Sequence, residues 1–269
     1  MAGAGELPKP SYNARQYSGG RPSYPPQLFQ FIASHTPSHL FAWDVGTGTG
    51  QAIPSLAGLY KNVVGTDVSA MQLECAQKLP NVKYIETPRI LSVSDVEQKI
   101  APESSIDLIT IAQAMHWFDL PKFYEVVRWG LKKPNGIIAA WCYTTPQVND
   151  EVDAVFWPFY KSFSGPGWEE TTKVVDDKYQ SIHFPFEPVD GLKDTGPFEF
   201  KAEKVMSLEE YFAYIRSWSA YNAAKEKGVE MLTDEAVERF KYAWMNDGKN
   251  DKVVKFPIYL RMGRIGDSE

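Results

Sequence analysis

Cysteine and histidine are scarce in this chain. Its 269 residues include two cysteines, Cys75 and Cys142, both within apolar segments, and four histidines. So few thiols exclude a disulfide-built scaffold and favour a reducing compartment, and we therefore expect a cytoplasmic protein. Neither residue type occurs at the spacing of metal ligands, so no metal site is expected.

The chain also lacks an excess of basic residues and long apolar runs. The net charge is −6 and the sequence pI about 5.4, and without a basic stripe nothing favours a nucleic-acid partner. No apolar run approaches the roughly 18 residues of a membrane-spanning helix, and residues 1–10 lack the apolar core of a secretory signal. We expect a small-molecule ligand, no nucleic acid, no membrane, and a monomer or homodimer.

Aromatic residues are plentiful instead. They make up 14% of the chain, and many lie outside the strongest strand segments. Aromatic side chains fill cores, but they also line ligand pockets. Their placement favours an aromatic-lined pocket.

Short apolar segments alternate with helical segments through the first half of the chain. The expected strands are Phe41–Val45, Val63–Thr66, Val82–Ile85, Ile106–Ile111 and Gly136–Cys142. The expected helices are Gln27–Ser34, Gln51–Tyr60, Ala70–Lys78, Val93–Ile100 and Lys122–Leu131. This alternation predicts an α/β fold with a mostly parallel sheet covered on both faces.

The pattern changes after about residue 145. Residues 146–200 are rich in Pro, Gly and aromatics without a clear period, which indicates a cap insertion. A strand is expected over Phe198–Val205 and a closing strand over Val253–Met262. Between them, a capping box at Ser207 predicts one helix through Ala220, and a second helix is expected over Asp234–Met245.

A glycine-rich loop follows the first strand, at Asp44-Val-Gly-Thr-Gly-Thr-Gly50. Gly46, Gly48 and Gly50 would let the backbone approach a ligand at a helix N-terminus, although a tight strand–helix turn alone could also require glycine. Asp67 ends the second strand, where a carboxylate can accept both ribose hydroxyls of a nucleoside. The alternative is that Asp67 caps the next helix, a role that Ser69 could take instead.

Two nucleoside cofactors fit this loop and acid, a dinucleotide and S-adenosylmethionine. The dinucleotide fingerprint needs a third small residue where this chain has Gln51. Asp44 would also repel a pyrophosphate, whereas it suits a ligand that carries an amino group and a sulfonium. These two residues favour the methyl donor.

Several segments together resemble the class I S-adenosylmethionine-dependent methyltransferases of the methyltransferase-11 group. The Asp44–Gly50 loop resembles their first motif, Val64–Ser69 their second-strand segment and Ile111–Asp119 their motif after strand four. Arg21–Pro25 and Tyr214–Ala220 are similar to the terminal segments of a subfamily that includes trans-aconitate and plant embryo-abundant-like methyltransferases.

The resemblance implies a fold and a division of the chain. The fold is a doubly wound, mostly parallel seven-stranded sheet (the Rossmann-like methyltransferase fold), in strand order 3-2-1-4-5-7-6 with the last strand antiparallel. Residues 1–25 form an N-terminal lid and residues 26–269 the methyltransferase domain. A helical and aromatic cap comprises the insertion at about 146–200 and helices at about 207–245.

The resemblance also implies a binding site for S-adenosylmethionine and its product S-adenosylhomocysteine. After strand three this chain departs from the group's acid and small residue, which leaves Glu86, Thr87 or backbone groups for the adenine. The expected donor-binding residues are Tyr17, Arg21, Asp44, Gly46, Thr47, Gly48, Gly50, Asp67, Val68, Thr87, Gln113 and His116.

The acceptor is expected to be a small organic acid, methylated on a carboxylate or another oxygen. His116 is either the catalytic base or part of the cofactor shell, and a carboxylate needs no base. Trp117, Tyr214 and Trp218 would form the acceptor wall unless they belong to the core. Arg216 would grip the acid unless it pairs with Glu209 or Glu210.

Two other functions share these features. A nicotinamide-dependent oxidoreductase would have the same loop and acid, and a non-methylating relative could bind the donor without turnover.

Overall fold

The computed structural model describes residues 21–162 and 169–266. These residues form two compact units. The sheet unit comprises residues 22–147, 169–204 and 255–266, and the helical unit comprises residue 21 with residues 148–162 and 205–254. The boundary between the units falls inside strands β6 (Phe198–Ser207) and β7 (Asp251–Arg264).

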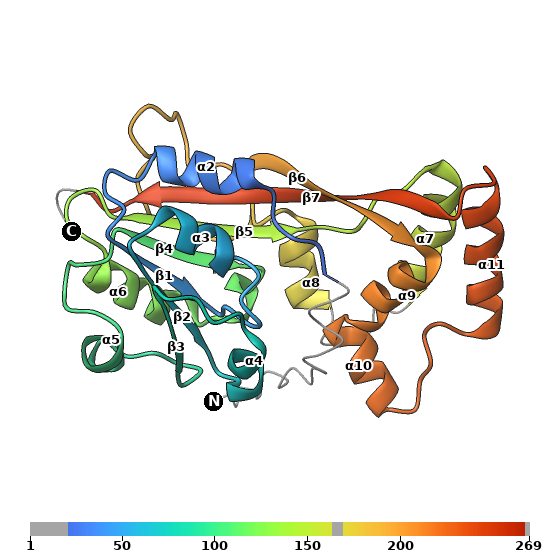
Figure 1. The fold of residues 1–269 in the computed structure, drawn as a ribbon, viewed down its shortest axis with the longest axis horizontal. Helices are drawn as coiled ribbons and strands as arrows, with labels where there is room; N and C mark the ends of the chain where they lie inside the picture. The colour runs from blue at the N-terminus through green and yellow to red at the C-terminus, as the bar shows by residue number, and fades with distance from the viewer. Residues whose placement is uncertain (1–20, 163–168, 267–269) are drawn as a thin grey trace. The chain divides into compact units, whose positions relative to one another are not determined.

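The strands form one seven-stranded sheet in the order β3-β2-β1-β4-β5-β7-β6 (Figure 1). The first five are β1 (Phe41–Val45), β2 (Asn62–Asp67), β3 (Val82–Glu86), β4 (Leu108–Ala112) and β5 (Ile137–Tyr143). They pair in parallel, whereas β7 runs antiparallel to β5, with Ile137 opposite Arg264 and Tyr143 opposite Ile258. The expected strand order and the antiparallel strand are confirmed.

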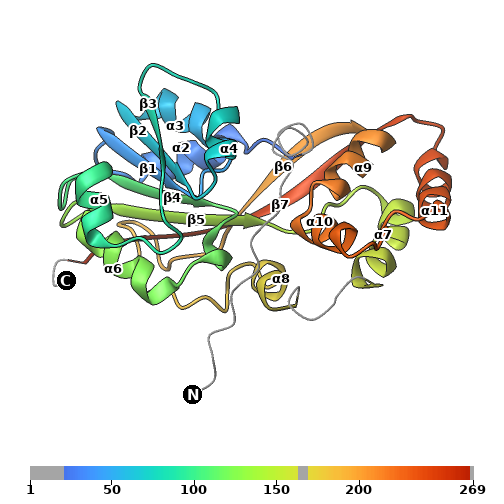
Figure 2. The ribbon, with the colours of Figure 1, turned by 90° about the horizontal axis from the view of Figure 1, so that it is seen from below.

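Helices cover both faces of this sheet because the central strands are apolar on both sides. Figures 1 and 2 show α2 (Pro26–Ser34) and α3 (Ile53–Leu59) on one face, and α5 (Val93–Lys99) and α6 (Leu120–Gly130) on the other. On the first face Phe29 packs edge-on against Trp141, with ring centroids 5.8 Å apart. On the second face Val96 and Val127 join a core cluster with Trp43. One further helix of the sheet unit, α4, spans Ala70–Cys75.

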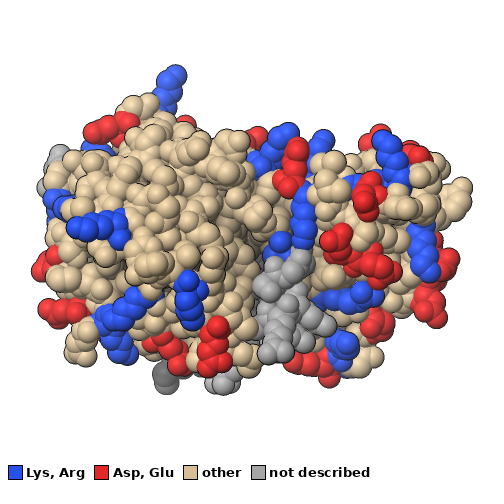
Figure 3. Space-filling view, in the orientation of Figure 1, with Lys and Arg blue, Asp and Glu red and all other residues tan. Residues whose placement is uncertain are grey.

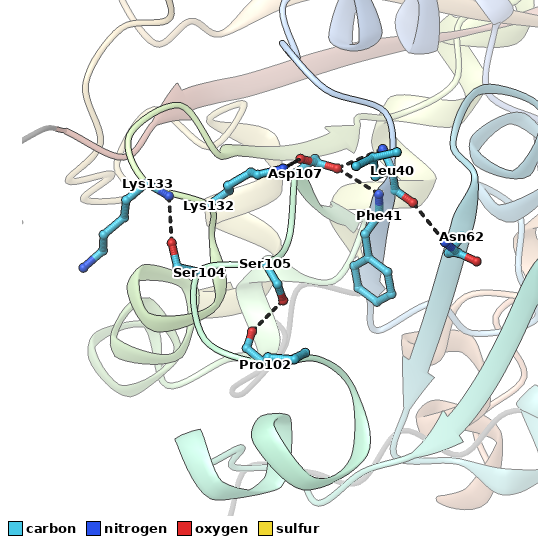
Figure 4. Close-up of polar contacts among 9 residues, drawn as sticks. All are labelled: Leu40, Phe41, Asn62, Pro102, Ser104, Ser105, Asp107, Lys132 and Lys133. Carbon is cyan, nitrogen blue, oxygen red and sulfur yellow. Dashed lines mark hydrogen bonds and ion pairs between the residues drawn. The ribbon is translucent and has the colours of Figure 1, made fainter.

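The buried carboxylate of Asp107 holds the amino ends of the strands together (Figure 4). Its Oδ2 accepts hydrogen bonds from the backbone N–H groups of Leu40 and Phe41, both at 2.9 Å. Its Oδ1 accepts a hydrogen bond from Lys132 Nζ at 3.1 Å. Both carboxylate oxygens therefore have partners, which gives Asp107 a structural role at the edge opposite to the glycine loop.

The helical unit contains α7 (Asp150–Ser162), α9 (Leu208–Arg216), α10 (Ser219–Glu226) and α11 (Asp234–Met245). The capping box at Ser207 and Glu210 is present, and α11 has the expected bounds. The expectation of one helix from Ser207 through Ala220 is wrong, because the chain breaks between α9 and α10. Trp218 is extended there (φ −68°, ψ 138°) and its ring packs edge-on against Phe156, 6.0 Å away. Tertiary packing of this ring overrides the helical pattern.

Residues 146–200, in which the sequence shows no clear period, contain regular structure. This stretch contains α7 and α8 (Glu169–Asp176). Pro158 lies inside α7, so a residue that usually interrupts helices obscured the pattern. Residues 169–200 belong to the sheet unit.

Charged side chains of opposite sign are interspersed on the face drawn in Figure 3, and Lys and Arg do not gather into one patch there. Within the described residues, no helix has the length and apolar character needed to cross a membrane.

Candidate functional site

The loop after β1 forms a close-fitting backbone cradle. Gly46, Gly48 and Gly50 have φ values of +68°, +58° and +82°, which L side chains rarely adopt. A Cβ on Gly46 would lie 2.8 Å from Ala114 Cβ, and one on Gly48 would lie 2.8 Å from Gln72 Oε1. Both positions thus require glycine for conformation and for space.

Asp67, at the end of β2, fastens this loop to the sheet. Its Oδ2 accepts the N–H of Gly48 at 2.8 Å, and its Oδ1 accepts the N–H of Ser69 at 2.9 Å. A carboxylate offers about four acceptor sites, so both oxygens keep capacity for ligand hydroxyls. Burial raises the pKa of Asp67. The N-cap of α4 is Ser69, whose side chain accepts from Gln72 N, so Asp67 is not used as that cap.

Asp44, within β1, is fully buried, and only one of its two carboxylate oxygens has a hydrogen-bond partner among the described residues. Its Oδ1 accepts a hydrogen bond from the Thr110 hydroxyl at 2.6 Å, whereas its Oδ2 has no hydrogen-bond partner among the described residues. Burial raises the pKa of Asp44 to about 6, and the hydroxyls of Thr110 and Thr47 act in the opposite direction. In contrast to Asp107, this carboxylate has an oxygen available for a ligand cation.

A turn after β4 brings a short helix, η1 (Met115–Trp117), next to the glycine loop. Gln113 has φ +57°, and its side-chain amide holds the backbone of Tyr143, with Oε1 accepting the Tyr143 N–H at 2.8 Å. The Gln113 Nε2 donates to Tyr143 O at 3.3 Å. Gln113 therefore has a local structural role, and its predicted contact with the donor stays a prediction.

His116 lies half-buried on η1, and its ring centroid is 5.1 Å from that of Trp117. Its Nδ1 is 2.9 Å from the hydroxyl of Tyr179. Burial lowers the pKa of His116 to about 4. The imidazole is therefore neutral near pH 7 and is a weak base.

The other predicted donor-binding residues of the sheet unit follow β2 and β3. Thr87 is buried and its N–H donates to Asp67 O at 2.9 Å, whereas Glu86 is exposed. Thr87 is thus the better placed of these two residues for a buried adenine contact. Val68 is 50% exposed. A small hollow nearby is lined by Val45, Arg89, Ile90, Leu91, Phe118, Asp119, Lys122 and Phe123.

The predicted acceptor residues of the second half lie in the helical unit. Tyr214 and Trp218 are buried, with ring centroids 5.7 Å apart. Arg216 is exposed and stacks over the Phe212 ring at 5.8 Å, and its positive charge acts to lower the pKa of Tyr221. Arg21 is half-buried, donates to Ser217 O at 3.0 Å and lies 5.7 Å from the Tyr214 ring centre. Tyr17, and most of the predicted lid, lie outside the described residues.

Sequence reasoning missed three residues that shape the site. Gln72 lies against Gly48, and the Tyr84 hydroxyl is 3.2 Å from where a Cβ on Gly50 would lie. Tyr179 contacts His116 from a segment without any sequence period. The alternation of β3 could have indicated Tyr84, but no local signal pointed to Gln72 or Tyr179.

Comparison with known proteins shows the family. A methyltransferase domain of the methyltransferase-11 family matches residues 43–140. A protein of Dictyostelium discoideum that is named a methyltransferase is 32% identical over 257 residues, which cover 93% of this chain and 92% of that protein. The chain belongs to the class I S-adenosylmethionine-dependent methyltransferases.

Two further relatives agree with membership of this methyltransferase family. A Saccharomyces cerevisiae protein named an S-adenosylmethionine-dependent methyltransferase is 24% identical, over 81% of this chain and 84% of that protein. A solved structure from Anaeromyxobacter dehalogenans, described as a type II methyltransferase, has a TM-score of 0.75 and 30% identity, over 91% of this chain and 98% of that one. The nicotinamide alternative is not favoured by these relatives. The finer resemblance to trans-aconitate or plant methyltransferases stays a prediction.

The family's cofactor, S-adenosylmethionine, fits the residues of the sheet unit. The cradle of Gly46 and Gly48 admits close backbone contact, and Asp67 keeps acceptor capacity. The unpartnered Oδ2 of Asp44 offers a buried anionic acceptor. Among the described residues, no group of three or more His, Cys, Asp and Glu side chains is placed to hold a metal ion.

Proposed function

We propose that this methyltransferase transfers the methyl group to a carboxylate, or another oxygen, of a small organic acid. The observation that carries the proposal is the state of His116, whose pKa burial lowers to about 4. Such a weak base would remove a proton from a phenol or an ammonium only with difficulty. A carboxylate is already ionised near pH 7 and needs no base.

In this proposal the chain acts by positioning its ligands. Gly46, Thr47, Gly48 and Gly50 bring backbone close to the donor, Asp67 accepts the ribose hydroxyls and Asp44 receives the amino group. Thr87, Val68 and Gln113 border the donor, and the donor-binding role of Tyr17 and Arg21 stays a prediction from the sequence. The bound donor supplies the electrophilic methyl group. Holding donor and acceptor in line supplies most of the rate increase. A cytoplasmic location and a monomer or homodimer remain part of this proposal.

Calorimetry with S-adenosylhomocysteine and with NAD tests the donor assignment. We expect S-adenosylhomocysteine to bind and NAD not to bind, because Gln51 and Asp44 do not suit a pyrophosphate. The Asp44→Asn variant keeps the size of the side chain and removes its negative charge. It should therefore bind S-adenosylhomocysteine more weakly. Binding of NAD without binding of S-adenosylhomocysteine would refute the assignment.

The affinity for S-adenosylhomocysteine should fall as the pH is lowered through about 6. Asp44 has a pKa of about 6, so its carboxylate gains a proton over this range and loses its attraction for the ligand's amino group.

In the ligand-free protein the same raised pKa makes the folded state bind more protons than the unfolded state. The free energy of unfolding should therefore decline as the pH rises from about 4 to about 6. Titrations with S-adenosylhomocysteine at pH 5, 6 and 7 measure the change in affinity, and unfolding of the ligand-free protein at pH 5 and 6 measures the change in stability. Both quantities should depend less on pH in Asp44→Asn. Unchanged affinity at pH 5 would contradict the assigned role.

The acceptor class can be tested by screening carboxylic acids, phenols, amines and thiols with labelled donor. Arg216→Ala should lower turnover of an acid by roughly 10-fold or more, because a charge-assisted hydrogen bond is lost, with donor affinity unchanged. Arg239→Ala, another exposed arginine of the helical unit, is the matched control. Methylation of phenols, amines or thiols and of no acid would refute the proposal.

A further inference from the structure

Tyr179 is a fully buried residue held firmly inside the sheet unit. It follows α8 with φ +61°, and its N–H donates to Val174 O at 3.0 Å. Its carbonyl accepts a hydrogen bond from Arg261 Nη1 at 2.9 Å. The backbone of this segment is therefore fixed, and with it the place of the phenol.

The Tyr179 hydroxyl has three neighbours that together determine where its proton lies. The backbone N–H groups of Met115 and His116, at the start of η1, face the phenol oxygen and favour negative charge on it. These N–H groups have no partner within their own helix, as is usual for a first turn. With these two groups facing the oxygen, the O–H donates to His116 Nδ1, 2.9 Å away.

The proton of the neutral His116 ring must then be on Nε2. Across residues 21–162 and 169–266, no protein group hydrogen-bonds Nε2, since the Tyr179 contact is the hydrogen bond that His116 makes. Nε2 is not among the fully buried polar atoms that have no partner. Because it has no hydrogen-bond partner either, it must keep some accessible surface. His116 thus presents one N–H donor to a ligand.

We propose that Tyr179 is a positioning residue that fixes the tautomer of His116, so that Nε2–H donates a hydrogen bond to the acceptor oxygen and His116 does not act as a base. This inference rests on the proposed oxygen acceptor. No proton is transferred to or from His116 in the methylation of a carboxylate.

The opposite tautomer, which a base would need, is disfavoured by the same contacts. It would place a proton on Nδ1 that points at a phenol oxygen which two backbone N–H groups already face. Burial raises the pKa of Tyr179 well above its usual value, so the phenol keeps its proton and cannot accept one from His116 as a phenolate. Burial lowers the pKa of His116 as well, which keeps the ring neutral. Cys142 and Tyr24 also face the phenol and oppose its ionisation.

The tautomer can be measured directly by NMR on protein labelled with ¹⁵N-histidine and saturated with S-adenosylhomocysteine. The signals of His116 are those missing from the His116→Gln spectrum. We expect the two-bond ¹⁵N–¹H pattern of the Nε2–H tautomer from pH 6 to 8 in the wild type. Tyr179→Phe should alter this pattern because it removes the donor to Nδ1. A wild-type Nδ1–H tautomer, an imidazolium, or a pattern unchanged by Tyr179→Phe would overturn the proposal.

A pair of His116 variants provides a second test that does not depend on the folding of Tyr179→Phe. The amide N–H₂ of glutamine can reach the place of Nε2, whereas that of asparagine is too short. On the acid that the screen finds to turn over fastest, His116→Gln should keep kcat/KM within about 5-fold, and His116→Asn should lose roughly 10- to 100-fold. Equal losses in both variants would indicate a base and overturn the proposal.

Donor binding separates failure of this inference from failure of the proposed function. S-adenosylhomocysteine affinity should be unchanged, within about 3-fold, in Tyr179→Phe, because Tyr179 has no proposed contact with the donor. If the screen finds no acid, the proposed acceptor class is wrong whatever the tautomer. If an acid is found and the NMR pattern is that of Nδ1–H, the acceptor class stands and the role of Tyr179 is wrong.

Discussion

Replacing Asp67 by alanine is expected to weaken S-adenosylhomocysteine binding by roughly 100-fold. The carboxylate is proposed to accept ribose hydroxyls, and hydrogen bonds to charged groups contribute about 1.5–3 kcal/mol each. It also holds the N–H of Gly48 in the loop, so the variant loses a ligand contact and the arrangement of the loop together. Calorimetry with the purified variant measures the affinity.

Asp107→Ala is the matched control for this experiment. Asp107 likewise accepts two backbone N–H groups, from Leu40 and Phe41, but at the amino ends of the strands. Its loss should lower the free energy of unfolding and leave the affinity within about 3-fold. If Asp67→Ala binds as tightly as the wild type, the nucleoside site does not lie at the end of β2.

Arg261→Leu is expected to lower the free energy of unfolding by about 3 kcal/mol. Arg261 is buried on β7, and its guanidinium donates to Tyr179 O at 2.9 Å, Thr195 O at 3.3 Å and the Thr195 hydroxyl at 3.1 Å. Desolvation lowers the pKa of Arg261, so burial of this cation is costly and depends on these bonds. Leucine would leave the buried carbonyl of Tyr179 without this donor and would remove both bonds to the half-buried Thr195, whose carbonyl keeps the N–H of Met262. Urea unfolding followed by tryptophan fluorescence measures the change.

Arg264→Leu, on the same strand, provides the comparison. Arg264 pairs with Glu187 at 2.6 Å, but the side chains of Glu187 and Asp190 beside it are 49% and 86% exposed. Such partly solvated pairs contribute about 0–1 kcal/mol, so this variant should be much less destabilised. A loss for Arg261→Leu no larger than that for Arg264→Leu would show that Arg261 does not fasten the 179–195 segment to the sheet.

Local patterns in the sequence predicted the sheet core closely. The bounds of β1 and α11 agree with the structure, and β2 and β3 differ from expectation by a residue or less at each end. Buried parallel strands are short apolar runs, and glycines and caps mark where they end. The strand order came from the family resemblance instead, because alternation alone does not give the order of strands.

The sequence failed where burial of one side chain outweighed local preference. The helix from Ser207 ends at Arg216 because Trp218 turns its ring into the aromatic core of the helical unit. In α7, packing of Phe156 and Phe159 keeps the chain helical around Pro158. Propensity is a weak guide at both places because the stabilising contacts come from distant segments.

By itself the sequence determined the alternating elements, the glycine loop and the acid that ends β2, because each depends on residues close together in the chain. The tertiary structure decided which polar groups near the loop keep free hydrogen-bonding capacity. Asp44 and Asp107 are both buried aspartates, but only the contacts around them distinguish a satisfied carboxylate from one with an oxygen to offer. His116 meets Tyr179 across 63 positions of sequence. Its proton is placed by that contact, and no local pattern encodes a partner so far along the chain.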